Sequence, residues 1–313
     1  MKRSALVATG PITKMAIYAP KILSNTSGCI RSGLASQRAS GFNLIELVIV
    51  IVVAGILSTV VAPIVMKPFL AYDDTSRRVA LVDAAEAAMR KIAGDIRDAI
   101  PNTVRSNGTA LELMPIRGGG RYRYSDLAAD NTALTPGVAD SQFQMLGNLP
   151  AIPSSARMVV YNTSSTLFYS AATTSGSGII TPTSTTVSLT DNGNEDTISL
   201  SSAFRFDLNG NGSPQKRFFL ATTPVTYHCD TTSGDIRLFE GYSTTVSQPA
   251  SRSSAPLNAA TTNAMLVSNV SSCNFSYSPG TSTRAALLTI ALGLTIDGET
   301  INLMHQLHIW NAP

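Results

Sequence analysis

The chain has 313 residues, with 23 lysines and arginines against 20 acidic residues and a formal net charge of +3. Charged residues make up only 14% of it, while serine, threonine, asparagine and glycine are plentiful, a composition that suits an exported protein. The positive excess belongs to residues 1–41, which hold six cations and no acid, so the remainder has 17 cations against 20 acids. This distribution removes the main support for nucleic-acid binding.

An apolar stretch follows the basic segment, from residue 42 to residue 66, and contains one charged residue, Glu46. As a helix it is long enough to cross the roughly 30 Å hydrocarbon core of a bilayer. The basic segment stays in the cytoplasm, so the chain beyond the helix is expected on the other side. A carboxylate inside hydrocarbon costs roughly 2.5–3.5 kcal/mol and calls for a partner. We expect that partner to be a cation near the head of another such helix.

Gly41, Phe42 and Glu46 stand in an order that resembles the type IV prepilin family, and the likeness continues through LIELVIVI to Pro63. An ordinary secretory signal is cut after its apolar core, at small residues. The resemblance implies cleavage before the core, between Gly41 and Phe42, by a prepilin peptidase that then methylates the amine of Phe42. It also implies that Glu46 serves in assembly with other pilin subunits. A plain signal anchor is the alternative, and Asn43 stands where the family more often has threonine.

Residues 1–41 are accordingly expected to be a cytoplasmic leader that is removed, with Met1 or Met15 as the initiator. The mature chain keeps two cysteines, Cys229 and Cys273, because the third lies in the leader. In an oxidising compartment an even number of cysteines predicts one disulfide. Two free buried thiols are the alternative.

A second helical segment continues the first, so that one helix is expected over residues 42–100. Pro101 ends it, and Pro63 and Pro68 are expected to kink it or melt it locally. The segment from residue 72 carries an apolar stripe at helical spacing, which predicts packing on a sheet. The stripe consists of Val79, Val82, Ala85, Met89, Ile92, Ile96 and Ala99.

Beyond Pro101 the pattern changes to short strands, and residues 101–313 are expected to form one β-rich domain. An Asn107-Gly108 turn precedes a first strand, 110–116, and a glycine triplet precedes a second, so we expect a hairpin between them. Residues 126–156 read as a long surface loop and 173–186 as a mobile turn. The further strands expected in this part are 121–125, 157–162, 166–172, 187–190 and 197–201, the last two forming a hairpin.

The C-terminal third is a succession of strands: 217–222, 224–230, 234–242, 264–277, 284–296 and 299–310. One cysteine follows a VTY strand and the other opens a CxFxY strand. This order resembles the larger minor pilins of the mannose-sensitive haemagglutinin (MSHA) pilus system and the related pseudopilins of type II secretion.

No established catalytic motif occurs, and neither a catalytic residue, a metal site nor a cofactor is expected. His305 and His308 are three apart on an expected strand, which sends them to opposite faces. DLNGNG (207–212) begins like a calcium loop, but Phe218 stands where the bidentate glutamate is needed.

Three hypotheses follow: a minor pilin subunit near a filament tip, an adhesin with specificity in residues 126–156 and 244–263, and a membrane-anchored enzyme. Glu46 favours the pilin hypothesis, because a helix that serves only as a membrane anchor does not require a carboxylate. The prediction is an α+β, pilin-like protein with a long N-terminal helix, membrane-spanning over 42–66, packed on an antiparallel sheet. It is expected in the inner membrane with its C-terminal domain in the periplasm, and on the pilus after assembly.

Overall fold

The computed structural model describes residues 41, 43–125, 132–172, 178–206, 212–281 and 284–310. Residues from Pro63 onward form one compact unit, and the start of the chain through Ala62 forms another. Residues 1–40 of the leader and Phe42 lie outside the described residues, as do most of DLNGNG and residues 173–177 of the expected mobile turn. The described part of that turn is not a mobile surface segment, because Ile179 and Ile180 are buried in a hydrophobic core.

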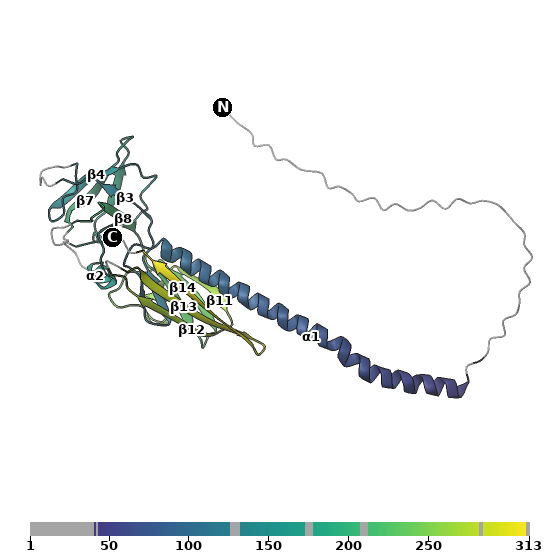
Figure 1. Ribbon diagram of the computed structural model, residues 1–313. Coiled ribbons are helices and arrows are strands. Elements are labelled where there is room, and N and C mark those ends of the chain that lie inside the picture. Colours follow the sequence, from purple (N-terminus) through teal and green to yellow (C-terminus); the bar gives the residue numbers. More distant parts are fainter. Residues whose placement is uncertain are drawn as a thin grey trace, which may run out of the picture. The chain divides into compact units, whose positions relative to one another are not determined.

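One helix, α1, runs from Leu44 to Arg97, which confirms the long N-terminal helix (Figure 1). Its backbone is helical through both prolines, so the expected local melting does not occur. The helix ends at Arg97, before the expected end at Ile100. Ile100 already donates its N–H to the carbonyl of Met114 at 2.8 Å, so pairing with the sheet ends the helix before the proline does.

The second half of α1 packs through a stripe that is shifted from the predicted one. Val79 is 54% exposed, contrary to prediction, whereas Leu81, Ala88 and Ala93 are buried. The stripe turns gradually around the helix because 3.6 residues per turn do not divide evenly into spacings of three and four. The other predicted members are buried except Val82, which is partly buried against the same core.

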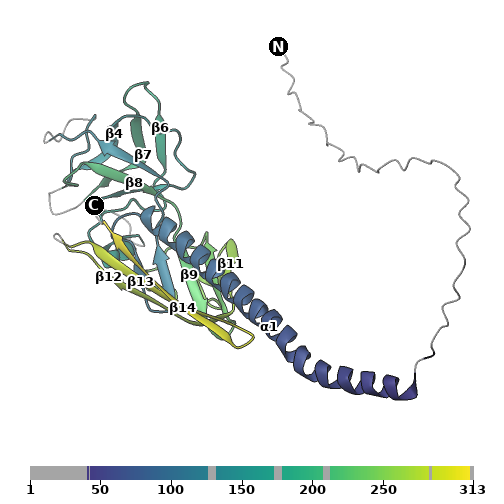
Figure 2. The same cartoon turned by 45° about the vertical axis from the view of Figure 1, so that its right-hand side comes forward.

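The stripe faces two antiparallel sheets, which share the first hydrophobic core with α1. The five-stranded sheet has the order β1 (Arg105–Ser106), β2 (Ala110–Leu113), β9 (Val225–Asp230), β10 (Asp235–Glu240) and β11 (Thr262–Ser268). The three-stranded sheet consists of β12 (Val270–Ser278), β13 (Ala286–Ile296) and β14 (Glu299–Ile309), drawn in green to yellow beside α1 (Figure 2). The strands predicted in the C-terminal third are confirmed with one exception. Residues 264–277, expected as one strand, are divided between β11 and β12, which belong to different sheets.

A short bridge connects the two sheets. Phe275 of β12 donates its N–H to the carbonyl of Gly108 at 2.8 Å, and the hydroxyl of Ser106 donates to the carbonyl of Phe275 at 2.6 Å. Gly108 has φ +97° in the turn between β1 and β2, a conformation that glycine adopts without strain. The predicted Asn107-Gly108 turn is confirmed, and it also joins the sheets.

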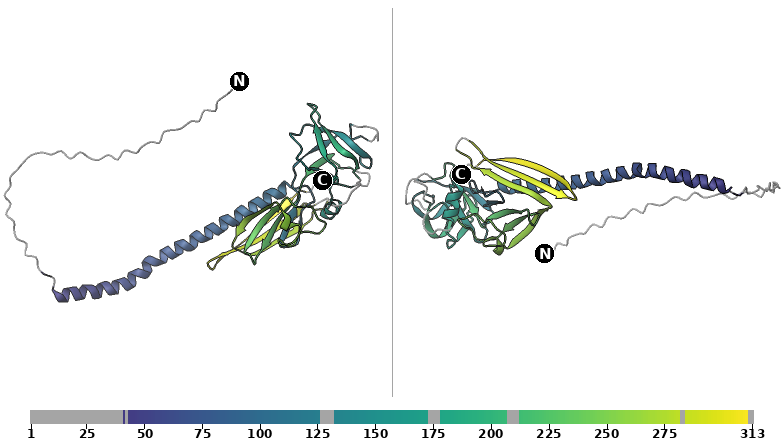
Figure 3. Two further views of the ribbon diagram at one scale, coloured as in Figure 1. Left: turned by 180° about the vertical axis from the view of Figure 1, so that it is seen from behind. Right: turned by 90° about the horizontal axis from the view of Figure 1, so that it is seen from below.

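A second hydrophobic core is inserted between β2 and β9, which are neighbours in the first sheet. Its six-stranded sheet has the order β5 (Arg157–Val160), β8 (Arg217–Ala221), β3 (Gly118–Tyr122), β4 (Ala139–Leu146), β7 (Thr197–Arg205) and β6 (Val187–Thr190). A short helix, α2 (Ser165–Ala171), packs Phe168 and Tyr169 into it. Seen from behind, the inserted strands form a group apart from β12–β14 (Figure 3).

Several sequence-based predictions are wrong in this insertion. Residues 110–116 and 121–125 do not form a hairpin, because β2 and β3 join different sheets. The glycine triplet belongs to β3 itself, where a Cβ on Gly119 would lie 2.7 Å from the carbonyl oxygen of Phe218. Residues 126–156 are not one surface loop, since β4 lies within them and buries Phe143 and Met145.

A further wrong prediction is the strand expected at 166–172, which is the helix α2. Ser164 caps it by accepting a 3.1 Å hydrogen bond from the N–H of Leu167. The predicted hairpin of 187–190 with 197–201 is confirmed by the pairing of β6 with β7.

Candidate functional site

The residues around the expected cleavage position lie at the very start of α1. The carbonyl of Asn43 accepts hydrogen bonds from the N–H groups of Glu46 and Leu47, at 2.9 and 3.2 Å. Glu46 is exposed in the first turn, where the helix dipole favours a negative charge. A Cβ built on Gly41 meets nothing within 4 Å. Packing within this chain therefore does not require a glycine at that position.

The first half of α1 exposes a continuous apolar surface. Leu44 is 78% exposed, Ile51 60% and Ile64 65%, and no charged residue occurs from Leu47 to Met66. In a soluble protein so large an apolar surface marks an interaction site. By length and composition α1 is the one helix among the described residues that fits a membrane crossing. This property is compatible with a single-pass membrane protein.

Burial and polar contacts together hold the second half of α1 to the sheets. Tyr227 of β9 donates its phenol hydrogen to the carboxylate of Asp95, and burial, reinforced by this carboxylate, raises the pKa of Tyr227. The phenol consequently stays protonated as a donor. At the other end, Arg78 pairs with Glu299 at the start of β14. The packed half of the helix is thereby tied to the first core near both of its ends.

The predicted disulfide between Cys229 and Cys273 is confirmed. It joins β9 of the five-stranded sheet to β12 of the three-stranded sheet, with a Cα–Cα distance of 6.6 Å. For a loop of this size, with a sequence separation of 44, the chain-entropy model assigns about 4 kcal/mol. The bridge thus covalently links the two sheets on which α1 packs.

The segment 244–263, expected to carry binding specificity, is held to the sheet over its first part. Gln248 donates to the carbonyl of Ala110 at 2.9 Å, and Arg252 pairs with Asp235 at 2.6 Å. Although burial raises the pKa of Asp235, hydrogen bonds from Arg252 and Arg237 lower it, so its carboxylate stays charged. A short 3-10 helix, η1 (Leu257–Ala259), and the start of β11 complete the segment.

A buried polar cluster surrounds Glu112, and the sequence does not predict it. Glu112 on β2 is fully buried and accepts hydrogen bonds from Arg105 at 2.6 Å and from Tyr242 at 3.1 Å. Burial raises the pKa of Glu112, and Arg105 lowers it in part. The only signal in the sequence is one acid in an otherwise apolar strand, which does not reveal its partners.

Arg105 also connects this cluster to the insertion. Its guanidinium lies 3.5 Å from the ring centroid of Tyr169 on α2. Nearby, Asn162 donates to the carbonyl of Pro101 at 2.8 Å, and Asn102 donates to the carbonyl of Asn162 at 2.9 Å. These polar contacts connect the first core to the insertion, and their role is to stabilise the fold.

The expected absence of a metal site stays a prediction, and the described residues contain no group of three His, Cys, Asp or Glu placed to bind a metal. His305 is partly buried on the core-facing side of β14 and His308 is exposed on the other side, as alternation predicts. The calcium-like segment DLNGNG falls almost entirely outside the described residues.

Comparisons of the chain with protein-family models, with curated proteins and with solved structures give no match.

Proposed function

We propose that the chain is a pilin-like subunit that a prepilin peptidase cuts between Gly41 and Phe42 and that assembles into a filament through α1. The observation that carries this proposal is the exposed apolar first half of α1, interrupted only by Glu46 in its first turn. That surface needs a membrane before assembly and neighbouring helices afterwards. The proposal makes the chain a substrate of the peptidase and a structural component, with no catalytic role of its own.

The finer proposal is a minor pilin of an MSHA-like type IV pilus, placed near the tip, with a type II secretion pseudopilin as the alternative. It rests on the order of strands around Cys229 and Cys273. The localisation that goes with it is the inner membrane, with the C-terminal domain in the periplasm, followed by the pilus surface.

A second candidate function is binding at the cell surface through the insertion. Residues between β2 and β9, joined by Ile100, form a second core, although β2 and β9 pair directly with each other. Such an insertion extends a subunit without changing the sheet that holds α1. An adhesin role would therefore coexist with the filament role.

Processing is tested by replacing Gly41 with leucine and measuring the mass of the mature N-terminus. We expect Gly41→Leu to leave an intact precursor, because the added side chain blocks entry of the scissile bond into the peptidase. Gly55→Leu, within α1, is the matched control, since a Cβ at Gly55 also meets nothing within 4 Å. A normal N-methylphenylalanine terminus in Gly41→Leu would sink the processing proposal.

Assembly is tested by Glu46→Val, which removes the only charge from the apolar half of α1. Removal of one member of a buried ion pair typically costs about 3–5 kcal/mol, because the other charge is left uncompensated. We expect the variant to insert and to be cleaved, but not to co-purify with sheared filaments. Ile49→Val is the matched control in the same segment. Normal incorporation of Glu46→Val would show that the acid is not an assembly partner.

A further inference from the structure

The strand β14 is the longest free edge among the described sheets. It ends the order β12-β13-β14 and pairs with β13 over eleven residues, Glu299–Ile309, without a register shift. Among the described residues no isolated bridge connects its other side to a strand. By contrast, the free edge β11 is shorter and its pairing with β10 is interrupted by a register shift at Ile236 and Arg237.

The turn before β14 determines which backbone groups point away from β13. Asp297 and Gly298 both have positive φ, +48° and +85°, as in a two-residue type I′ turn. The carbonyl of Ile296 then bonds the N–H of Glu299, and bonded pairs alternate from there. The residues whose N–H and C=O groups face the free edge are Thr300, Asn302, Met304, Gln306 and His308.

This edge lacks the features by which proteins usually prevent strand addition, which include prolines, bulges and charged side chains. None of the edge-facing residues is proline, lysine, arginine or an acid. Met304, at the centre of the strand, is 68% exposed. The edge is therefore chemically open to a further strand.

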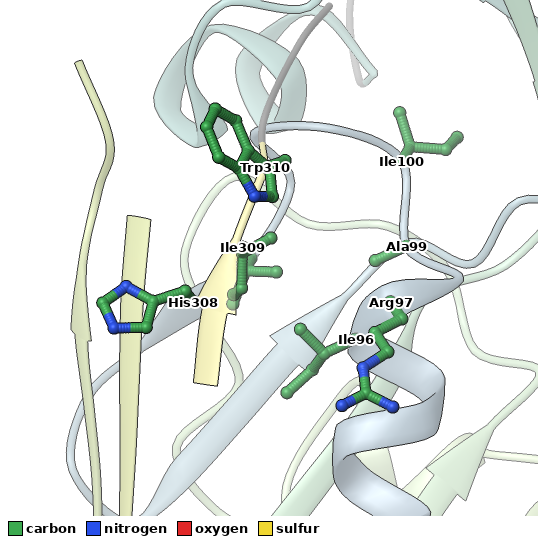
Figure 4. A pocket seen from close by; sticks show the side chains of 8 residues that line it. Ile96, Arg97, Ala99, Ile100, His308, Ile309 and Trp310 are labelled. Carbon is green, nitrogen blue, oxygen red and sulfur yellow. The ribbon is translucent and has the colours of Figure 1, made fainter. Parts of the chain in front are cut away.

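Two hollows lie at the ends of β14, and α1 contributes to both. The one at the start of the strand has a volume of about 360 Å³ and is lined by Arg78 and Glu299, which already pair with each other. The one at the end has a volume of about 310 Å³ and is lined by Ile96, Arg97 and Trp310. In Figure 4 Arg97 lies on the last turn of α1 and Trp310 directly follows β14, and their side chains point in different directions.

The second hollow presents a cation beside apolar surface. Arg97 forms no ion pair with any carboxylate of the described residues, and Trp310, the only tryptophan of the chain, is 86% exposed. Ile96 supplies a buried apolar wall. A side chain that combines a short apolar stem with a carboxylate, such as glutamate, complements this surface.

We propose that β14 is the docking strand for an extended segment of another polypeptide, which adds to its free edge and places an acidic side chain at Arg97. In strand addition the main-chain hydrogen bonds supply affinity and pockets for alternate side chains supply specificity. The inference goes beyond the filament proposal, because pairing at β14 requires neither cleavage at Gly41 nor Glu46.

The test uses the full chain in detergent micelles and two capped synthetic peptides, ETVTVTVE and KTVTVTVK. Because Trp310 is the only tryptophan, its fluorescence reports directly on the second hollow. We expect the glutamate peptide to shift and saturate the emission, and the lysine peptide to bind about tenfold more weakly through charge repulsion. Hydrogen exchange should show protection of the edge-facing amides of β14 by the glutamate peptide.

Gln306→Pro removes one edge-facing N–H while leaving the bonds to β13 intact, and Gln306→Ala is its matched control. We expect the proline variant to bind at least about tenfold more weakly and the alanine variant to bind like wild type. Circular dichroism checks that the proline variant is folded. If the proline variant is unfolded, Arg97→Glu tests the proposal instead, since this variant should bind the lysine peptide more tightly than the glutamate peptide.

Several results would overturn the proposal. These are absence of binding at millimolar peptide, equal binding by folded Gln306→Pro and wild type, and an unchanged peptide preference in Arg97→Glu. A concentration-dependent dimer that is lost in Gln306→Pro would show that a second copy of this chain, and not a different polypeptide, occupies the edge.

Discussion

The two halves of α1 have the same backbone conformation and opposite surroundings. In the first half Ile51 is 60% exposed, whereas in the second half Ile92 is 1% exposed. Both isoleucines suit a helix that buries one face, and only the second is buried within this chain. An apolar run on a helix thus predicts that its surface is buried. The spacing of charged residues along the helix indicates whether a membrane or the protein's own sheets bury it.

The two carboxylates in apolar surroundings make the same comparison more sharply. Glu112 is fully buried and has Arg105 and Tyr242 as partners in its own chain. Glu46 is exposed, and no cation of the described residues forms an ion pair with it. The first carboxylate stabilises the fold, while the second is available to a partner from outside.

The largest difference is expected between alanine substitutions at these two carboxylates. Glu112→Ala should lower the free energy of unfolding by about 3–5 kcal/mol, because it leaves Arg105 without its buried partner. Glu46→Ala should leave that free energy unchanged, since its side chain is exposed. Denaturant unfolding of the two purified variants in detergent measures both. Equal losses would contradict the distinction between the two sites.

A smaller difference in stability is expected between alanine substitutions at the two isoleucines. Ile92→Ala opens a cavity in the first core and should cost roughly 2–5 kcal/mol. Ile51→Ala should change the stability of the packed domain by less than about 0.5 kcal/mol. Limited proteolysis and thermal unfolding in detergent compare the pair. If Ile51→Ala proved as damaging as Ile92→Ala, the first half of α1 would have to pack on the chain itself.

These contrasts also explain what the sequence predicts well. The alternation along β14, with Ile301, Leu303 and Leu307 on one side, distinguishes the core face from the outer face without reference to the rest of the fold. The same holds for the apolar length of α1 and for the hairpin of β6 with β7, whose turn carries an Asp-Asn-Gly sequence. Each of these elements is specified by its own local pattern.

The predictions fail where the local pattern is short or where distant residues decide. Phe168 and Tyr169 are adjacent and both buried. Two adjacent buried aromatic residues are compatible with a helix of seven residues and also with a buried strand, so the sequence does not distinguish the two. The separation of β2 from β3 depends on which sheet each strand joins, and that pairing involves β9 and β8 far along the chain. Likewise the partners of Glu112 are residues 105 and 242, and no periodic pattern in the sequence relates these positions to residue 112.

The next prediction concerns pH and the charge of Glu112. Burial holds the pKa of Glu112 above its ordinary value of 4.5, so above that pH the folded chain binds more protons than the unfolded chain. The free energy of unfolding should therefore fall as pH rises from 4.5 through the raised pKa, by about 1.4 kcal/mol for each unit of the shift. Glu112→Gln should lack this fall. Parallel stability profiles of wild type and Glu112→Gln would contradict the assignment.

The smallest effect is expected where the two halves of α1 meet, at Arg77. It pairs with Asp74 and with Asp297, both at 3.1 Å, and the two acidic side chains are 66% and 69% exposed. Exposed pairs of this kind contribute about 0.2–1 kcal/mol, so Arg77→Ala should be only slightly less stable than wild type. The difference should vanish near 1 M salt, where the screening length is about 3 Å. Arg90→Ala, which loses a pair with Glu86 within the helix, serves as the control for charge removal alone. If Arg77→Ala lost as much stability as Ile92→Ala, ion pairs and not apolar burial would hold the second half of α1 to the sheets.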